Sequence, residues 1–157
     1  MPDRFFKPSL QENYWFVPNY QTGEAASLVI DLGCIKEING LYMKNFHNAH
    51  KNNRGTQYFS IYVRYNESQT WLHTPTDPSY LDRVYSYYTK KIQFVSFKET
   101  QMVRYIKMTV DTYYGKGGGL SYIAESEWFR GSAYTSKHVL QFCTRPYIIN
   151  PSLLSEQ

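Results

Sequence analysis

Two polar loops of this sequence contain the side chains best suited to chemistry: His47, Asn48, Arg54, Tyr113, Tyr114 and Lys116. An aromatic ring can stack on the apolar face of a sugar, while planar polar groups meet the sugar hydroxyls in pairs. Arg54 suits the second role because its rigid guanidinium group can donate two hydrogen bonds to adjacent oxygens. These residue types predict a surface that binds a polar ligand, with Lys116 at its rim.

Four of these residues also have a purely structural interpretation. Arg54 is equally suited to a buried salt bridge or to a clamp on the backbone of its own loop. His47 fits an ordinary loop histidine, and either Tyr113 or Tyr114 fits a role in core packing. The sequence leaves these alternatives open.

No motif in the chain predicts catalysis. The sequence contains no GxSxG, HExxH or P-loop pattern. His47 and His50 are three residues apart in a loop, which is too weak a pattern for a metal site. We therefore expect a protein that is not an enzyme and has no certain cofactor.

The composition narrows the class of protein further. A chain of 157 residues with 42% hydrophobic and 19% charged residues is typical of one globular domain. The net charge of +4 comes from scattered basic residues, so no nucleic-acid partner is expected. No apolar run approaches the roughly 20 residues of a transmembrane helix, so no transmembrane segment is expected.

The beginning of the chain, MPDRFFKPSL, lacks the apolar region of a secretory signal. We therefore expect an intracellular protein if this is the whole chain, and an extracellular or cell-surface location if it is a domain of a longer one. Two cysteines are present, Cys34 and Cys143, and the sequence does not decide between a disulfide and two free thiols.

Short runs in which apolar and polar residues alternate predict strands over residues 28–32, 40–43, 59–64, 92–97, 105–110 and 123–130. The apolar members of these runs are expected in the core: Leu28, Ile30, Leu41, Phe59, Ile61, Val63, Ile106, Met108 and Val110. Residues 73–91 are expected to form an irregular excursion, 115–119 a flexible loop, and 139–142 an extra edge strand. With no helical pattern, the sequence predicts an all-β antiparallel sandwich or jelly roll.

A resemblance to a known family rests on the order of several segments: VIDLG, INGLYMKNFHN, NNRGTQYFSIYV, a Trp after a turn, RYIKMTV and IAESEWFRG. This order resembles the coagulation factor V/VIII type C domain, also called the discoidin domain, of the galactose-binding-like jelly rolls. The resemblance covers residues 12–131, and few residues precede Trp15. It implies a discoidin-like domain over residues 1–131 with a shortened N-terminal part, followed by a tail or extra edge strand over residues 132–157.

The resemblance implies a recognition module that binds through loops at one end of the sandwich. Relatives bind galactose-type sugars and other glycans, phospholipid headgroups or proteins. A glycan or glycoprotein is therefore the expected partner here, in adhesion or glycan recognition, with a protein-interaction or adaptor domain as the alternative. A phospholipid binder needs apolar side chains at its loop tips, and Phe46 is the one obvious candidate.

Some relatives also hold a structural calcium ion. Glu125 matches the position at which the last strand supplies a ligand, but the partner loop offers only Glu12 and Asn13. The disulfide that joins the two ends of many extracellular relatives has no match, because Cys143 lies beyond the resemblance.

Asn66-Glu67-Ser68 forms an N-glycosylation sequon within a predicted hairpin turn. A glycan on Asn66 is expected if a eukaryote secretes the protein, and a chance match is the alternative.

Overall fold

The computed structural model describes residues 14–47, 53–85, 91–127, 147–148 and 154–155. These residues form one nine-stranded antiparallel sheet and a 3-10 turn at Gly23–Ala26, with no α-helix in this part of the chain. The strands are β1 (Tyr14–Pro18), β2 (Ser27–Asn45), β3 (Phe59–Arg64), β4 (Leu72–His73), β5 (Thr76–Asp77), β6 (Ile92–Val110), β7 (Gly117–Glu127), β8 (Tyr147–Ile148) and β9 (Leu154–Ser155). The predicted all-β antiparallel fold is confirmed.

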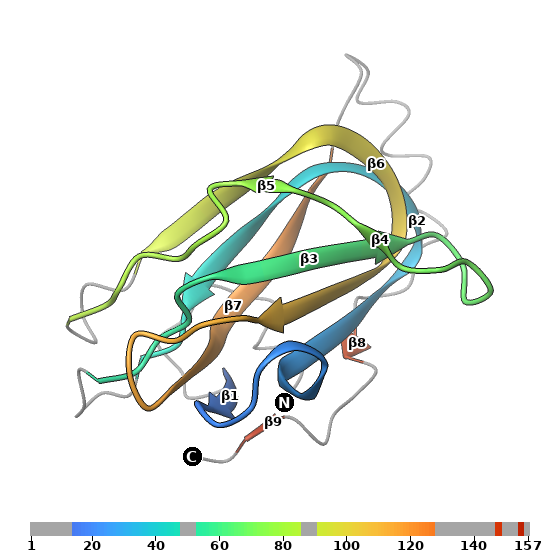
Figure 1. Ribbon diagram of the computed structural model, residues 1–157. Helices are drawn as coiled ribbons and strands as arrows, with labels where there is room; N and C mark the ends of the chain where they lie inside the picture. The colour runs from blue at the N-terminus through green and yellow to red at the C-terminus, as the bar shows by residue number, and fades with distance from the viewer. Residues whose placement is uncertain (1–13, 48–52, 86–90, 128–146, 149–153, 156–157) are drawn as a thin grey trace.

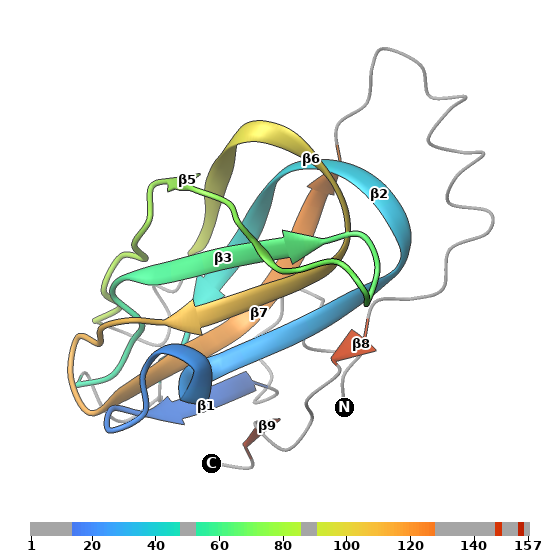
Figure 2. The same cartoon turned by 45° about the vertical axis from the view of Figure 1, so that its right-hand side comes forward.

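The two longest strands, β2 and β6, make a sandwich out of this single sheet. Ser27–Asp31 of β2 pairs with the second half of β6 and lies in the layer that contains β3. Gly40–Lys44 pairs with the first half of β6 and lies in the layer that contains β7 and β1. Figures 1 and 2 show both ribbons curving from one layer into the other. The pairing register between β2 and β6 shifts twice at this bend. Such shifts place extra residues on one strand of a pair, and this lets the sheet turn sharply.

The core lies between these layers. All nine residues expected in the core are at most 4% exposed, and Trp15, Val95 and Ile123 join them. Period-two alternation predicted this correctly, because every second side chain of a strand points to the same face.

The structure corrects several predicted boundaries. The separate strands expected near residues 30 and 42 are one strand, and so are those expected near 95 and 108. A strand, β1, lies ahead of residue 28, where the first predicted strand begins. The predicted edge strand over residues 139–142 lies outside the described residues.

The glycine run at Gly117–Gly119 was expected to be a flexible loop, but it is the beginning of β7 and pairs with β1. The backbones approach so closely here that a Cβ on Gly119 would lie 1.8 Å from the carbonyl oxygen of Trp15, and its φ is +116°. Only glycine tolerates this combination, so the run serves close packing between strands.

Candidate functional site

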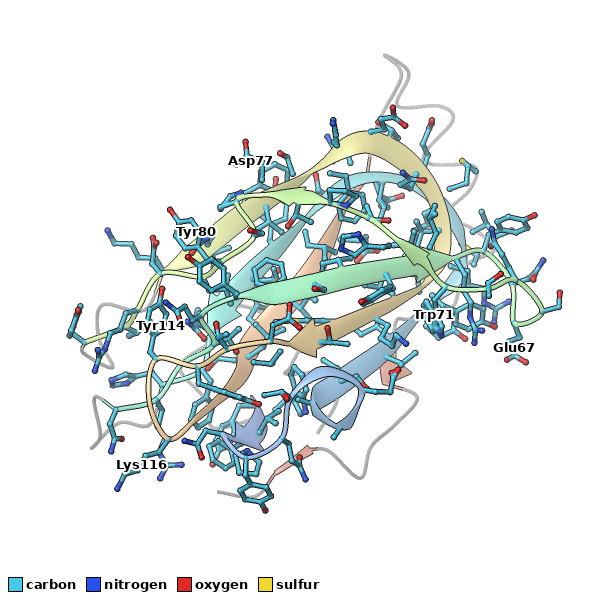
Figure 3. All side chains as sticks on the ribbon, viewed as in Figure 1. Glu67, Trp71, Asp77, Tyr80, Tyr114 and Lys116 are labelled. Carbon is cyan, nitrogen blue, oxygen red and sulfur yellow. The ribbon has the colours of Figure 1, made fainter. Side chains whose placement is uncertain are left out.

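The two loops singled out in the sequence meet at one end of the sandwich. The amide of Gly55 donates to the carbonyl of Gly117 at 2.7 Å, and the amide of Lys116 donates to Asn53 at 2.7 Å. The amide of Tyr114 returns a bond to Gly55 at 3.0 Å. Figure 3 shows Tyr114 and Lys116 at this end, while Glu67 and Trp71 lie at the other end of the molecule.

Asn45, the last residue of β2, organises this end. Its side-chain oxygen accepts from the amides of Phe46 at 2.8 Å and Thr56 at 2.9 Å. Its side-chain nitrogen donates to the carbonyls of Thr56 at 2.9 Å and Asp82 at 3.0 Å. A buried amide that uses both donors and both acceptor sites is fully satisfied. Asn45 therefore ties three segments together at the loop end.

A second amide, Gln93 of β6, holds the segment around Asp82 from the other side. It accepts a hydrogen bond from the amide of Asp82 at 3.0 Å and donates one to the carbonyl of Tyr80 at 2.8 Å. Asp82 is thus held at both its amide and its carbonyl, by Gln93 and Asn45 respectively. This fixes the backbone that carries the neighbouring side chain of Arg83.

The two candidate tyrosines of the sequence are anchors between segments. The hydroxyl of Tyr113 donates to the carbonyl of Gln21, and its ring packs against the core. The hydroxyl of Tyr114 donates to the carbonyl of Leu81. Burial raises the pKa of both hydroxyls above the ordinary tyrosine value.

The other predicted site residues are separated from one another. The guanidinium of Arg54 lies 5.0 Å from the ring centre of Phe16 in β1, and His47 is buried. Lys116 is exposed, and Asn48 lies outside the described residues. The five of these six residues that the structure describes lie in segments at this end of the sandwich, but Arg54, Tyr113 and Tyr114 contact three different segments.

Phe46 does not project from the loop tip. It is 1% exposed, and its ring lies 4.9 Å from that of Tyr14 and 5.1 Å from that of Phe16. Phe46, the one candidate for an apolar side chain at a loop tip, therefore does not fill that role, because its side chain packs against β1.

A hollow of about 340 Å³ does lie at this end, beside Tyr114, and we call it the loop-end hollow. Its lining residues are Asn45, Asp82, Arg83, Val84, Tyr85, Lys91, Ile92 and Gln93. The guanidinium of Arg83 lies 5.2 Å from the ring centre of Tyr85 and 6.0 Å from that of Tyr114. The ring of Tyr85 is 66% exposed, which leaves a large aromatic surface for a ligand.

The lining of the loop-end hollow contains charged residues of both signs, two cationic and one anionic. Arg83 and Lys91 carry positive charge, and Asp82 carries negative charge. The arrangement can bind hydroxyl groups or an acidic ligand, since it offers both donors and acceptors beside an aromatic ring.

Sequence reasoning missed Arg83 and Lys91 because they follow no strand pattern. A usable signal was present in the irregular excursion, where Asp82 and Arg83 stand between Tyr80 and Tyr85. Loops carry a large share of the binding residues of proteins, so charged residues between two loop tyrosines were candidates.

A second hollow, of about 370 Å³, lies along the edge of β3, and we call it the flank hollow. Tyr58 and Asp111 line it, and the hydroxyl of Ser60 donates to Asp111 at 2.7 Å. The chain leaves the edge of β3 after Thr74 to form β5 on the other layer, and it returns at Ser79. Figure 3 shows Asp77 on this departing segment and Tyr80 after its return.

Glu125, the expected calcium ligand, forms an ion pair with Lys36. The two side chains approach to 2.7 Å and are 13% and 6% exposed. Within the described ranges no three His, Cys, Asp or Glu side chains form a metal-binding group, and residues 9–13 lie outside them. The calcium site stays a prediction, and the ammonium group of Lys36 already neutralises this carboxylate.

Cys34 is disulfide-bonded, and the other cysteine of the chain, Cys143, lies outside the described residues. The described residues contain no helix that is long and apolar enough to cross a membrane.

Comparison with known families gives no match. No family model and no curated protein matches the sequence. The fold and the loop-end geometry thus define an all-β antiparallel sandwich with an aromatic and cationic hollow at one end.

Proposed function

We propose that this protein is a non-catalytic recognition module of the discoidin kind, with jelly-roll connections, that binds a glycan of galactose or related type. The observation that carries the proposal is the loop-end hollow, where Arg83 and Lys91 lie beside the exposed ring of Tyr85. An aromatic surface next to paired polar groups is what sugar recognition requires.

The frame of the hollow supports this function. Asn45 and Gln93 hold the carbonyl and the amide of Asp82 by one hydrogen bond each, and they also bind the carbonyls of Thr56 and Tyr80. This part of the hollow is therefore held by the protein itself. A site that is already ordered loses less entropy on binding, which matters for a ligand as small as one sugar.

Affinity for a single sugar should be weak. Hydrogen bonds to a charged group contribute about 1.5–3 kcal/mol each, and an aromatic stack contributes about 1 kcal/mol. The entropy lost on ordering and association offsets most of this gain. The net binding free energy is then about 4 kcal/mol, which corresponds to a dissociation constant of about 1 mM. Useful avidity would then come from several copies of the domain.

A glycan array, probed with multivalent protein with and without added calcium, tests the proposal. Binding to one sugar class is expected, and it should be lost in Tyr85→Ala. Tyr65→Ala is the matched control. Tyr65 is also an exposed tyrosine, but it follows the end of β3, whereas the loop-end residues lie near the beginning of that strand. Silence across the array, or equal loss in both variants, would count against glycan binding at this hollow.

Recognition of a protein partner is the second candidate function, and one observation favours it. Tyr42 of β2 and Phe94 of β6 are 40% and 39% exposed, with ring centres 5.0 Å apart. Ile92 on β6 is also exposed. Adjacent exposed apolar side chains on a sheet are typical of an interaction surface. Loss of partner capture in Phe94→Ser, with glycan binding absent, would favour this function.

A further inference from the structure

The turn after β3 carries a motif that the proposed function does not use. Asn66, Glu67 and Ser68 are all exposed, and they match the pattern Asn-X-Ser/Thr in which X is not proline. The sequence contains one other Asn-X-Ser/Thr, at Asn150, but Pro151 occupies its middle position and excludes it. Asn66 is therefore the one acceptor in the chain.

The turn leaves a specific atom of Asn66 available. The side-chain oxygen of Asn66 accepts hydrogen bonds from the hydroxyl of Ser68 and from the amide of Gln69, both at 2.9 Å. The side-chain nitrogen donates to no other residue in the part of the chain that the structure describes. The turn thus orients the side-chain amide of Asn66 through its oxygen, and its nitrogen can react with an external group.

An independent observation concerns the compartment. Cys34 is disulfide-bonded, and disulfides persist in the oxidising environments of the secretory pathway and the cell exterior. These are also the environments in which asparagine receives a glycan.

We propose that Asn66 is an N-glycosylation site and that the protein passes through an oxidising secretory compartment. The side-chain nitrogen of Asn66 forms a bond to the anomeric carbon of an oligosaccharide carried on a polyprenyl diphosphate. The bond between that carbon and the diphosphate oxygen breaks, the diphosphate lipid leaves with the electron pair, and the nitrogen loses one proton to a base. No atom is oxidised or reduced.

The position of the turn keeps the glycan away from the loop-end hollow. Asn66 follows the end of β3, whereas the loop-end residues lie near its beginning, and Figure 3 shows Glu67 and Tyr114 at opposite ends of the molecule. The modification is therefore compatible with ligand binding, but it does not depend on the proposed function.

Expression of the full chain behind a cleavable secretion signal in eukaryotic cells tests the proposal. Mass spectrometry of the secreted protein, before and after N-glycanase treatment, should find a glycan on Asn66 and none on Asn150. Asn66→Gln and Ser68→Ala should remove it, while Ser68→Thr should keep it because threonine satisfies the same motif. Unmodified Asn66 in the secreted wild-type protein would overturn the proposal, and so would a glycan that persists on Asn66 in Ser68→Ala.

Discussion

Tyr113 and Tyr114 are neighbours in the sequence, yet their hydroxyls bind two segments that are far apart in the chain. Tyr113 donates to the carbonyl of Gln21, and Tyr114 donates to the carbonyl of Leu81. One dipeptide thus connects the segment after β1 with the segment before β6. The pair therefore stabilises the frame of the loop end.

Tyr113→Phe should destabilise the protein by about 1 kcal/mol, because it removes one partly buried hydrogen bond and keeps the ring. Urea unfolding measures the change. Tyr20→Phe is the matched control, since Tyr20 is highly exposed and should unfold like the parent. Equal stability of the parent and Tyr113→Phe would show that the contact with Gln21 contributes nothing.

The raised pKa of Tyr113 predicts a loss of stability at alkaline pH. The unfolded tyrosine loses its proton near pH 10, whereas burial keeps the folded hydroxyl protonated to higher pH. The folded state then binds more protons than the unfolded state, so stability present below about pH 10 falls as the pH rises above it. Unfolding free energies measured at increasing pH should show a shallower fall in Tyr113→Phe, and parallel curves would contradict this assignment.

Asn45→Ala should cost about 2–4 kcal/mol, because it removes four hydrogen bonds and leaves both backbone groups of Thr56 without their partner in a buried site. Denaturant unfolding gives the magnitude. Asn19→Ala makes a suitable control, since its single exposed bond to Gly115 should contribute little. Similar losses in both variants would mean that Asn45 does not organise the loop end.

Ile61→Asp should prevent folding, since it places a charge without a partner in the core between the layers. Circular dichroism of the purified variant tests this, with Thr100→Asp at an exposed position of β6 as the control. A cooperative melt like that of the parent would mean that Ile61 does not face the core.

The sequence predicted the core well because strand alternation is local. Phe59, Ile61 and Val63 alternate strictly, and the strand from Phe59 to Arg64 has the predicted bounds. The bend that joins the predicted pieces of β2 was missed. A glycine such as Gly33 can end a strand or lie in a bend within one, and the pairing of β2 with β6 on both sides of the bend decides which.

The site was harder to predict because its frame is made by distant contacts. Asn45 binds Asp82, which is 37 residues away, and nothing in the sequence near Asn45 indicates this. Arg54 was expected to face a ligand, but the proximity of Phe16 depends on where β1 lies. Tyr113 was expected at the same surface, but its ring packs on the core, so Tyr113→Ala should lower stability as well as any binding.

The most direct measurement is an NMR titration of the labelled protein with methyl β-galactoside, following the backbone amides around both hollows. We expect saturable shifts at Asp82, Arg83 and Lys91. Binding should be about tenfold weaker or more in Arg83→Ala and unchanged in Lys98→Ala, which alters an exposed basic residue outside the lining of either hollow. Saturable shifts confined to Tyr58 and Asp111 of the flank hollow, or no saturable shift at any amide, would contradict this expectation.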